Sequence, residues 1–110
     1  MIELIILNHL KLELSVPVYL EEPEDAPSSF VLIEKTGSGR ENRINSATFA
    51  FKSYAGSLYG AAALNDEVKT VVESLALLDD VGRVELNSDY NFTDVTTKRY
   101  RYQAVYDITY

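Results

Sequence analysis

The last thirteen residues, Lys98–Tyr110, constrain the fold more than any other segment, because they alternate with period two. In a strand, one face would carry Lys98, Tyr100, Tyr102, Ala104, Tyr106, Ile108 and Tyr110. The other face would carry Arg99, Arg101, Gln103, Val105, Asp107 and Thr109. The segment therefore predicts a long strand with tyrosines on one side and arginines on the other.

This strand has two interpretations. Tyrosine and arginine are enriched at protein–protein contacts, so the strand indicates a module that assembles with other protein surfaces. Tyrosine suits a partly buried contact, because its ring is apolar and its hydroxyl can stay hydrated. An ordinary C-terminal strand, with the aromatic face on the core and the basic face in water, explains the pattern equally well.

Hydrophobic periodicity predicts the other elements. Helices are expected at 2–13 and 57–78, and strands at 16–20, 28–35, 44–54, 81–88 and 98–110. Residues 2–13 fit a helix, although the leucines and valines from Leu10 to Leu20 alternate as in a strand, and Pro17 argues against a long central strand. Ser57 is the expected N-cap of the second helix, and Asp79 begins the turn after it. Residues 36–43 read as a flexible connection, too long for a two-residue hairpin turn.

This order, α-β-β-β-α-β-β, predicts an α+β fold in a single domain over residues 1–110. We expect an antiparallel or mixed sheet of about four to five strands, packed by two helices on one face.

Charge and composition bound the possible partners. The formal net charge of −7, without a basic run, disfavours binding to a phosphate backbone, so no nucleic-acid partner is expected. Without cysteine, disulfides, thiolate nucleophiles and Cys-based zinc sites are excluded. The apolar N-terminal run is too short to span a bilayer and has Glu3 where a signal peptide would be basic. We therefore expect a soluble intracellular protein with no membrane partner.

Few residues suggest chemistry. His9 is the only histidine; Glu13 would lie one helical turn away, but a structural histidine is favoured over a catalytic or metal-binding one. The Gly37–Arg40 turn lacks the ending of a phosphate-binding loop, and the acidic loop Glu21–Asp25 lacks EF-hand spacing. No nucleophile–base–orienter set is present. We expect no catalytic residues, no metal and no cofactor, and hence no enzyme.

Three segments carry a resemblance to a known family. They are Val16-Pro-Val-Tyr-Leu-Glu21, Phe30-Val-Leu-Ile-Glu34 and Arg99-Tyr-Arg-Tyr-Gln-Ala-Val-Tyr106. With the order of elements between them, they resemble the small tail-terminator and tail-completion proteins of long-tailed bacteriophages and prophages, particularly those of Gram-positive hosts.

The resemblance implies a structural protein of the virion. Such proteins form a ring, usually of six subunits, that caps the tail tube and offers its other face to the head connector. The implied partners are other copies of this chain, the tail tube protein and the head–tail connector protein. The implied location is the host bacterial cytoplasm before assembly and the tail or neck of the virion afterwards.

The resemblance also implies contact residues, which fall into three groups. They are Arg40, Glu41 and Arg43 at the hairpin tip, Arg99, Tyr100, Arg101 and Tyr102 on the last strand, and Glu21, Glu22 and Glu24 in the acidic loop. Head-to-tail rings need two complementary patches, and the acidic loop and the basic groups are such a pair in principle.

Two other classes of function stay open. In a small-molecule or protein binding module, the tyrosines of the last strand would line a pocket between sheet and helix with Phe49 and Phe51. An enzyme that uses carboxylates ranks last, because no spacing singles out a pair of acids.

Overall fold

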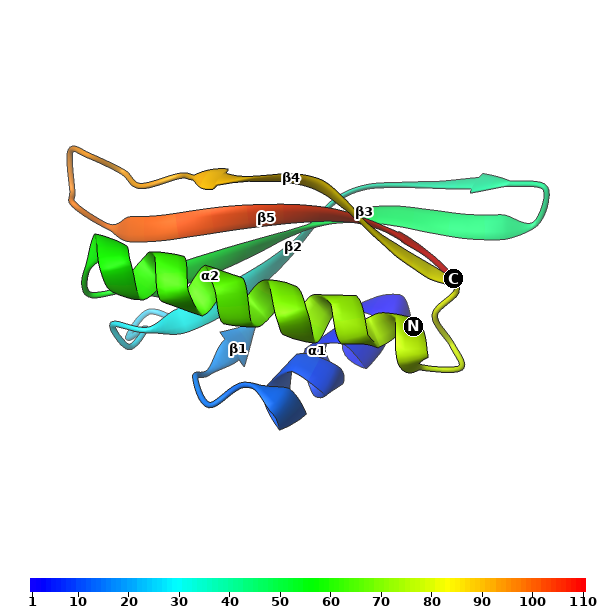
Figure 1. Ribbon diagram of the computed structural model, residues 1–110, viewed down its shortest axis with the longest axis horizontal. Coiled ribbons are helices and arrows are strands. Elements are labelled where there is room, and N and C mark those ends of the chain that lie inside the picture. Colours follow the sequence, from blue (N-terminus) through cyan, green and yellow to red (C-terminus); the bar gives the residue numbers. More distant parts are fainter.

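The computed structural model describes residues 1–110 and has the α+β fold expected from the sequence (Figure 1). Its elements are α1 (Ile2–Glu13), β1 (Val18–Tyr19), β2 (Phe30–Glu41), β3 (Ile44–Ala55), α2 (Leu58–Glu73), the 3-10 helix η1 (Ser74–Leu77), β4 (Arg83–Asn91) and β5 (Tyr100–Thr109). Both helices lie on the same side of one sheet. The predicted order α-β-β-β-α-β-β is confirmed.

The five strands form a mixed sheet in the order β1-β2-β3-β5-β4. β1 runs parallel to β2, with Val18 opposite Val31, and all other pairs are antiparallel. The strand expected at 16–20 is confirmed as an edge strand, although it is only two residues long. Because β1 pairs with only the start of β2, most of β2 also has an open edge.

The core lies between the sheet and the helices. Phe49 and Phe51 of β3 and Tyr106 of β5 are fully buried on the helix-covered face. Each helix buries one stripe against them; the stripes are Ile2, Ile6 and Leu10 on α1, and Ala61, Leu64, Val68 and Val72 on α2. The period-two pattern of the last strand is thus confirmed. In the inner part of β5, the face that carries Tyr106 packs on the core, as in the interpretation of the segment as an ordinary strand.

The long helix begins where the sequence predicts. The Ser57 hydroxyl oxygen accepts a hydrogen bond from the Gly60 N–H at 3.0 Å, which caps the first turn. The α-helical part ends at Glu73, and a 3-10 turn extends it to Leu77. Asp79 and Asp80 then form the expected turn.

The expectation of a flexible connection at residues 36–43 is wrong. β2 continues to Glu41 and β3 begins at Ile44, so Asn42 and Arg43 alone form the turn. Their φ angles are 51° and 66°, and two left-handed residues are typical of the two-residue turn that matches strand twist. This turn usually contains glycine, and the absence of glycine from Asn42–Arg43 hid it in the sequence.

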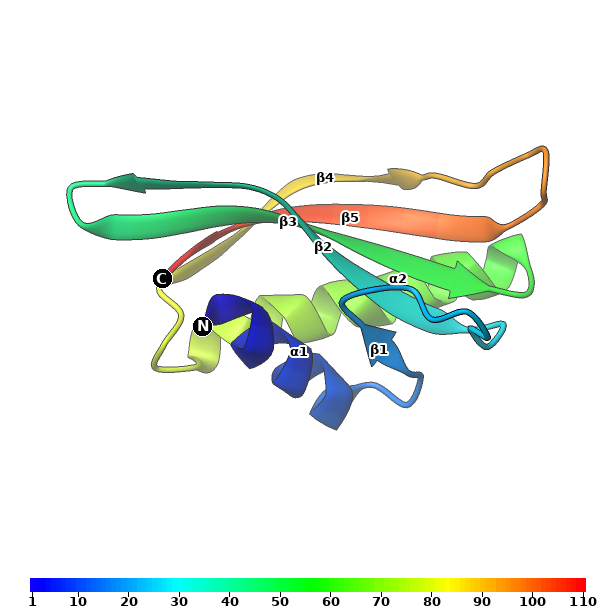
Figure 2. The same cartoon turned by 180° about the vertical axis from the view of Figure 1, so that it is seen from behind.

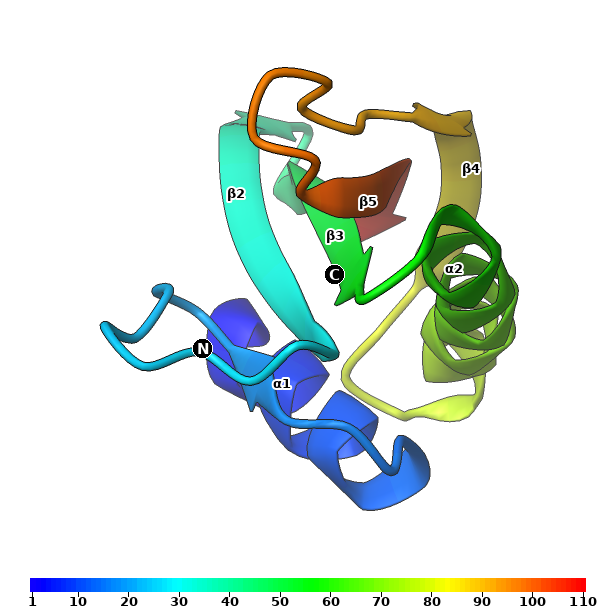
Figure 3. The same ribbon diagram turned by 90° about the vertical axis from the view of Figure 1, so that its left-hand side faces the viewer.

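The β2–β3 hairpin extends past the helices, as Figures 1 and 2 show on opposite sides of the molecule. We call residues 36–45 the arm; residues 34–44 are all exposed. The arm forms one end of a molecule that measures 44 × 25 × 24 Å. The other end, which faces the viewer in Figure 3, contains the start of α2 and the two loops at 20–29 and 92–99.

Candidate functional site

A row of stacked aromatic rings crosses the outer face of the sheet, the face that no helix covers. The register places Phe30 opposite Tyr54 and Tyr54 opposite Arg101, so these three side chains share a face. The Phe30 and Tyr54 rings stack at 4.4 Å with an interplanar angle of 7°. Tyr19 of β1 meets Phe30 edge to face at 5.9 Å. Aromatic pairs of this kind contribute beyond the area that they bury.

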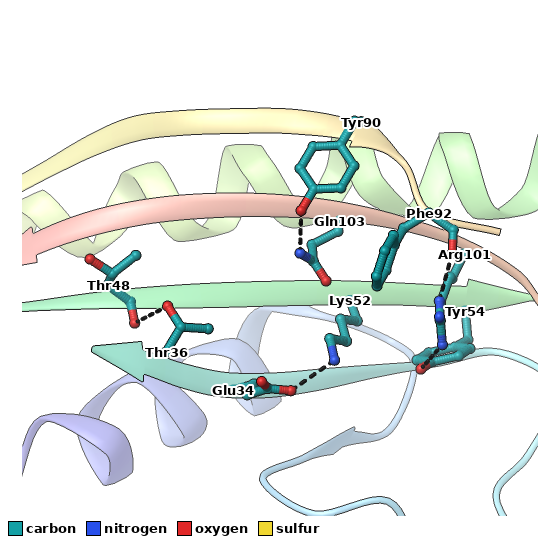
Figure 4. Close-up of polar contacts among 9 residues, drawn as sticks. All are labelled: Glu34, Thr36, Thr48, Lys52, Tyr54, Tyr90, Phe92, Arg101 and Gln103. Atoms are coloured by element: carbon teal, nitrogen blue, oxygen red, sulfur yellow. Dashed lines mark hydrogen bonds and ion pairs between the residues drawn. The ribbon is translucent and has the colours of Figure 1, made fainter. Parts of the chain in front are cut away.

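Arg101 continues this row onto the next strands. Its guanidinium carbon lies 5.7 Å from the centroid of the Tyr54 ring and 4.5 Å from that of the Phe92 ring. Its Nε donates a hydrogen bond to the Phe92 carbonyl at 2.6 Å, and Nη1 donates to the Tyr54 hydroxyl at 3.2 Å (Figure 4). Arg101 therefore ties β5 to β3 and to the segment that follows β4, and its charged group is engaged inside the chain.

Arg99 joins the same row to the acidic loop. Its guanidinium carbon lies 4.8 Å from the centroid of the Tyr54 ring, and Nη2 donates to Glu22 Oε2 at 3.0 Å. The two partners are 77 residues apart in the sequence. One acid of the loop and one arginine of the last strand, expected as contact residues between subunits, thus pair within one chain.

An open cleft of about 310 Å³ lies beside this ion pair, and we call it the end cleft. Its lining residues are Glu22, Glu24, Ala26, Pro27, Ser28, Phe30, Tyr54, Ala55, Gly56, Lys98, Arg99 and Tyr100. Its accessible apolar lining comes from Ala26, Pro27 and Ala55, because the rings of Phe30 and Tyr54 are only 2% and 4% exposed; Glu24 and Lys98 lie on its exposed rim. Neither Glu24 nor Lys98 forms an ion pair in the chain.

The loop at 92–99 borders the cleft and is ordered by Asp94. Asp94 Oδ1 accepts hydrogen bonds from the backbone N–H groups of Thr96 and Thr97, at 3.0 and 3.4 Å. These bonds favour the charged carboxylate and lower the pKa of Asp94. The loop presents Val95, which is 83% exposed.

The charged side chains at the tip of the arm, unlike that of Arg99, have no charged partner within the chain. The side chains of Arg40, Glu41 and Arg43 are exposed and form no ion pair in the chain. Ile44, next to Arg43, is 54% exposed. Ile44 was expected at the start of a strand but not among the contact residues, because nothing in the sequence shows that the strand leaves the core.

The structure therefore separates the expected contact residues. Glu22, Glu24, Arg99 and Tyr100 come together in the end cleft, with Glu21 next to them in the loop. The end of the β2–β3 hairpin, which carries Arg40, Glu41 and Arg43, lies at the far end of the molecule (Figure 1). Arg101 lies on the outer face, whereas Tyr102 lies on the helix-covered face opposite Ser53. Tyr54 and Phe92, which hold the two arginines, were not among the expected residues.

His9 has a structural contact. Its Nε2 lies 2.7 Å from the Ser74 hydroxyl oxygen, and that hydroxyl donates its proton to the Val71 carbonyl at 2.6 Å. Because a hydroxyl has only one proton, Nε2 must be the donor to Ser74. In a nucleophile–base pair the hydroxyl donates its proton to the imidazole, which is the reverse of the direction here. The bond between His9 and Ser74 instead connects α1 to the end of α2.

The space between the sheet and the helices is filled. Phe49 and Phe51, expected to line a pocket there in a binding module, have no exposed surface. Tyr106 is also fully buried, and its hydroxyl donates to Glu73 Oε2 at 2.6 Å. Burial, together with the Glu73 carboxylate, raises the pKa of Tyr106. The only hollow that the last strand shares with aromatic rings is the end cleft on the outer face.

No three acidic or histidine side chains are close enough to one another to hold a metal ion. No helix is long and apolar enough to cross a membrane. Among known proteins, no family model and no curated protein matches this chain.

Proposed function

We propose that this chain is a ring-forming tail-terminator or tail-completion protein of a bacteriophage or prophage. In this proposal, copies assemble with one another, cap the tail tube and join it to the head connector. The protein resides in the host cytoplasm before assembly and in the tail or neck of the virion afterwards.

One observation carries the proposal. The three segments whose sequences resemble tail terminators are far apart in the chain but adjacent in the fold. Tyr19, Phe30 and Arg101 each belong to a different segment, and all three lie in the row of side chains that centres on Tyr54. The residues behind the resemblance thus form one structural unit, as expected if the likeness reflects a shared architecture.

The shape of the subunit also supports assembly into a ring. The arm and the end cleft lie at opposite ends of the 44 Å axis and differ in charge and form. Two different surfaces at opposite ends favour head-to-tail contacts, which give a closed ring when the rotation between copies closes.

The test is co-expression with a tail tube protein from the phage or prophage that encodes this chain. We expect electron microscopy to show tubes with a ring at one end. For the assembled chain without tubes, light scattering should give a mass of several times the 12.4 kDa of one copy. Tubes that remain uncapped, together with a chain that stays monomeric at every concentration, would contradict the proposal.

A binding module for a small molecule is the second candidate. The end cleft, at about 310 Å³, reaches the lower limit of common ligand pockets and combines apolar and charged lining residues. This candidate predicts that a small-molecule library contains a compound that raises the melting temperature. Substitution of Glu24 or Lys98 by alanine would then reduce that rise.

A further inference from the structure

We infer that the tip of the arm of one copy docks into the end cleft of the next copy. This inference rests on the proposed function, because it assumes that copies of the chain assemble head to tail. It adds which surfaces meet and which residues fix their register.

The turn at the tip gives the first argument. Arg43 has a φ of 66°, and Gly is the residue usually found at this position of such turns. An arginine in the left-handed region is strained, and the pairing of β2 with β3 holds it there, since the Arg43 side chain itself forms no ion pair in the chain. Strained backbone clusters at functional positions. Arg43 therefore has the features of a residue kept for an intermolecular contact.

The chemistry of the two ends gives the second argument. At the tip, the exposed apolar side chain of Ile44 lies next to Arg43. The end cleft has accessible apolar lining residues, Ala26, Pro27 and Ala55, and an acidic rim residue, Glu24, without an ion-pair partner. An apolar side chain flanked by a cation fits an apolar lining flanked by a carboxylate.

Net charge favours the same pairing. The chain carries −7 overall, so two copies repel one another on average. The tip, with two arginines and one glutamate, is an exception to this excess of acid. Around the end cleft, the four acids of residues 21–25 outnumber Lys98 and Arg99. Such complementary patches steer encounter and fix register.

Symmetry makes a second copy the natural occupant. A twofold dimer that joins each tip to the other copy's cleft uses every tip and cleft and stops at two copies. A head-to-tail contact joins the tip of one copy to the cleft of the next and leaves the pair with one free tip and one free cleft. Every copy can therefore accept another until the ring closes.

The test uses two charge reversals, Arg43→Glu and Glu24→Arg. Each variant alone opposes like charges at every contact, so we expect the concentration for half-assembly to rise on the order of tenfold in sedimentation velocity. In an equimolar mixture, the native Arg43 of the Glu24→Arg variant can face the native Glu24 of the Arg43→Glu variant, and the two substituted residues can face each other. Every contact between the two variants then joins opposite charges, so the mixture should assemble as the native chain does. Native mass spectrometry should show equal numbers of the two variants in these assemblies.

Two matched controls separate local from general effects. Glu67→Arg and Lys11→Glu make the same kinds of charge reversal at exposed helix positions and should leave assembly unchanged. Circular dichroism must show that all four variants are folded. A second test that does not reverse charge is Arg43→Gly, which relaxes the turn and removes the side chain. It should weaken assembly, whereas Asn42→Gly should not.

The outcomes distinguish the two claims. If the native chain forms rings and both reversals assemble normally, the inference is overturned and the proposed function stands. If both reversals impair assembly but the mixture does not recover, the two residues do not face one another, and the inference is also overturned. If the native chain never assembles, alone or on tubes, both claims fail.

Discussion

The two ends of the molecule use the same residue types in opposite ways. At the cleft end, Arg99 bonds to Glu22, and Arg101 lies against the Tyr54 and Phe92 rings and donates to the backbone. At the arm end, Arg40 and Arg43 form no ion pair in the chain and project from a hairpin that no helix supports. One end is held together by its arginines, and the other presents them to the surroundings.

This difference shows that composition alone cannot separate structural from contact arginines. Each set has one arginine on a strand, Arg40 on β2 and Arg101 on β5, and one just outside a strand, Arg43 in the hairpin turn and Arg99 before β5. Whether an arginine is free depends on what the sheet register places beside it. The register puts Tyr54 opposite Arg101, whereas it puts only Asn45 opposite Arg40.

The largest effect is expected for Arg101→Ala. The substitution removes a charged donor from the Phe92 carbonyl and from Tyr54, together with two cation–π contacts. We expect the free energy of unfolding to fall by about 2 kcal/mol in urea denaturation. Arg40→Ala is the matched control and should change it by less than about 0.5 kcal/mol. Equal effects of the two substitutions would remove the distinction between the ends.

Arg43→Gly is expected to change stability in the opposite direction. Glycine adopts the φ of 66° without a steric penalty, although it also gains entropy in the unfolded chain. We expect the free energy of unfolding to rise by about 0.5–1 kcal/mol. A loss of stability, measured in the same urea titration, would mean that the Arg43 side chain makes contacts within the subunit.

A smaller effect is expected for Arg99→Ala. The ion pair with Glu22 is partly exposed, with side-chain exposures of 42% and 35%, so solvent screens it. We expect the free energy of unfolding to fall by about 0.5 kcal/mol, and this loss to become smaller as salt is added. The double variant, Arg99→Ala with Glu22→Ala, should lose little more free energy of unfolding than either single variant. Strictly additive losses would show that the two side chains do not interact in solution.

The smallest effect concerns pH. Because backbone N–H groups hold the carboxylate of Asp94, its folded pKa is below the ordinary value of 3.8. Its contribution to stability is therefore present above pH 3.8 and is lost as the pH falls through the folded value. Hydrogen exchange should show the amides of Thr96 and Thr97 losing protection in this range. In Asp94→Ala, protection of these amides should be low at every pH; unchanged protection would contradict the assigned bonds.

The sequence predicted those features that depend on local pattern. The 3.6-residue period and the Ser57 cap identify the long helix, and strict alternation identifies the last strand, although it left open whether the tyrosine face packs on the core or on another subunit. The short edge strand was located because Pro17 interrupts a longer alternating run. These signals reside in neighbouring residues, so they can be read without knowing the tertiary structure.

Features that depend on register or distant pairing could not be predicted. The turn at Asn42–Arg43 lacks glycine, so the sequence gives no indication that the hairpin is tight. Glu22 and Arg99 are 77 residues apart, and nothing in either segment identifies the other as its partner. Tyr54 was missed because its role depends on which residues the register places on either side of it.

The contact between arm and cleft can be tested most directly by cross-linking, because the chain has no cysteine of its own. We would introduce Ile44→Cys and Ala26→Cys in one chain and oxidise it at a concentration at which the native chain assembles. We expect a ladder of disulfide-linked species up to the ring, and no ladder from either cysteine alone or from Lys11→Cys with Ala26→Cys. Rings that form normally but cross-link no more than this control would contradict the proposed contact between arm and cleft.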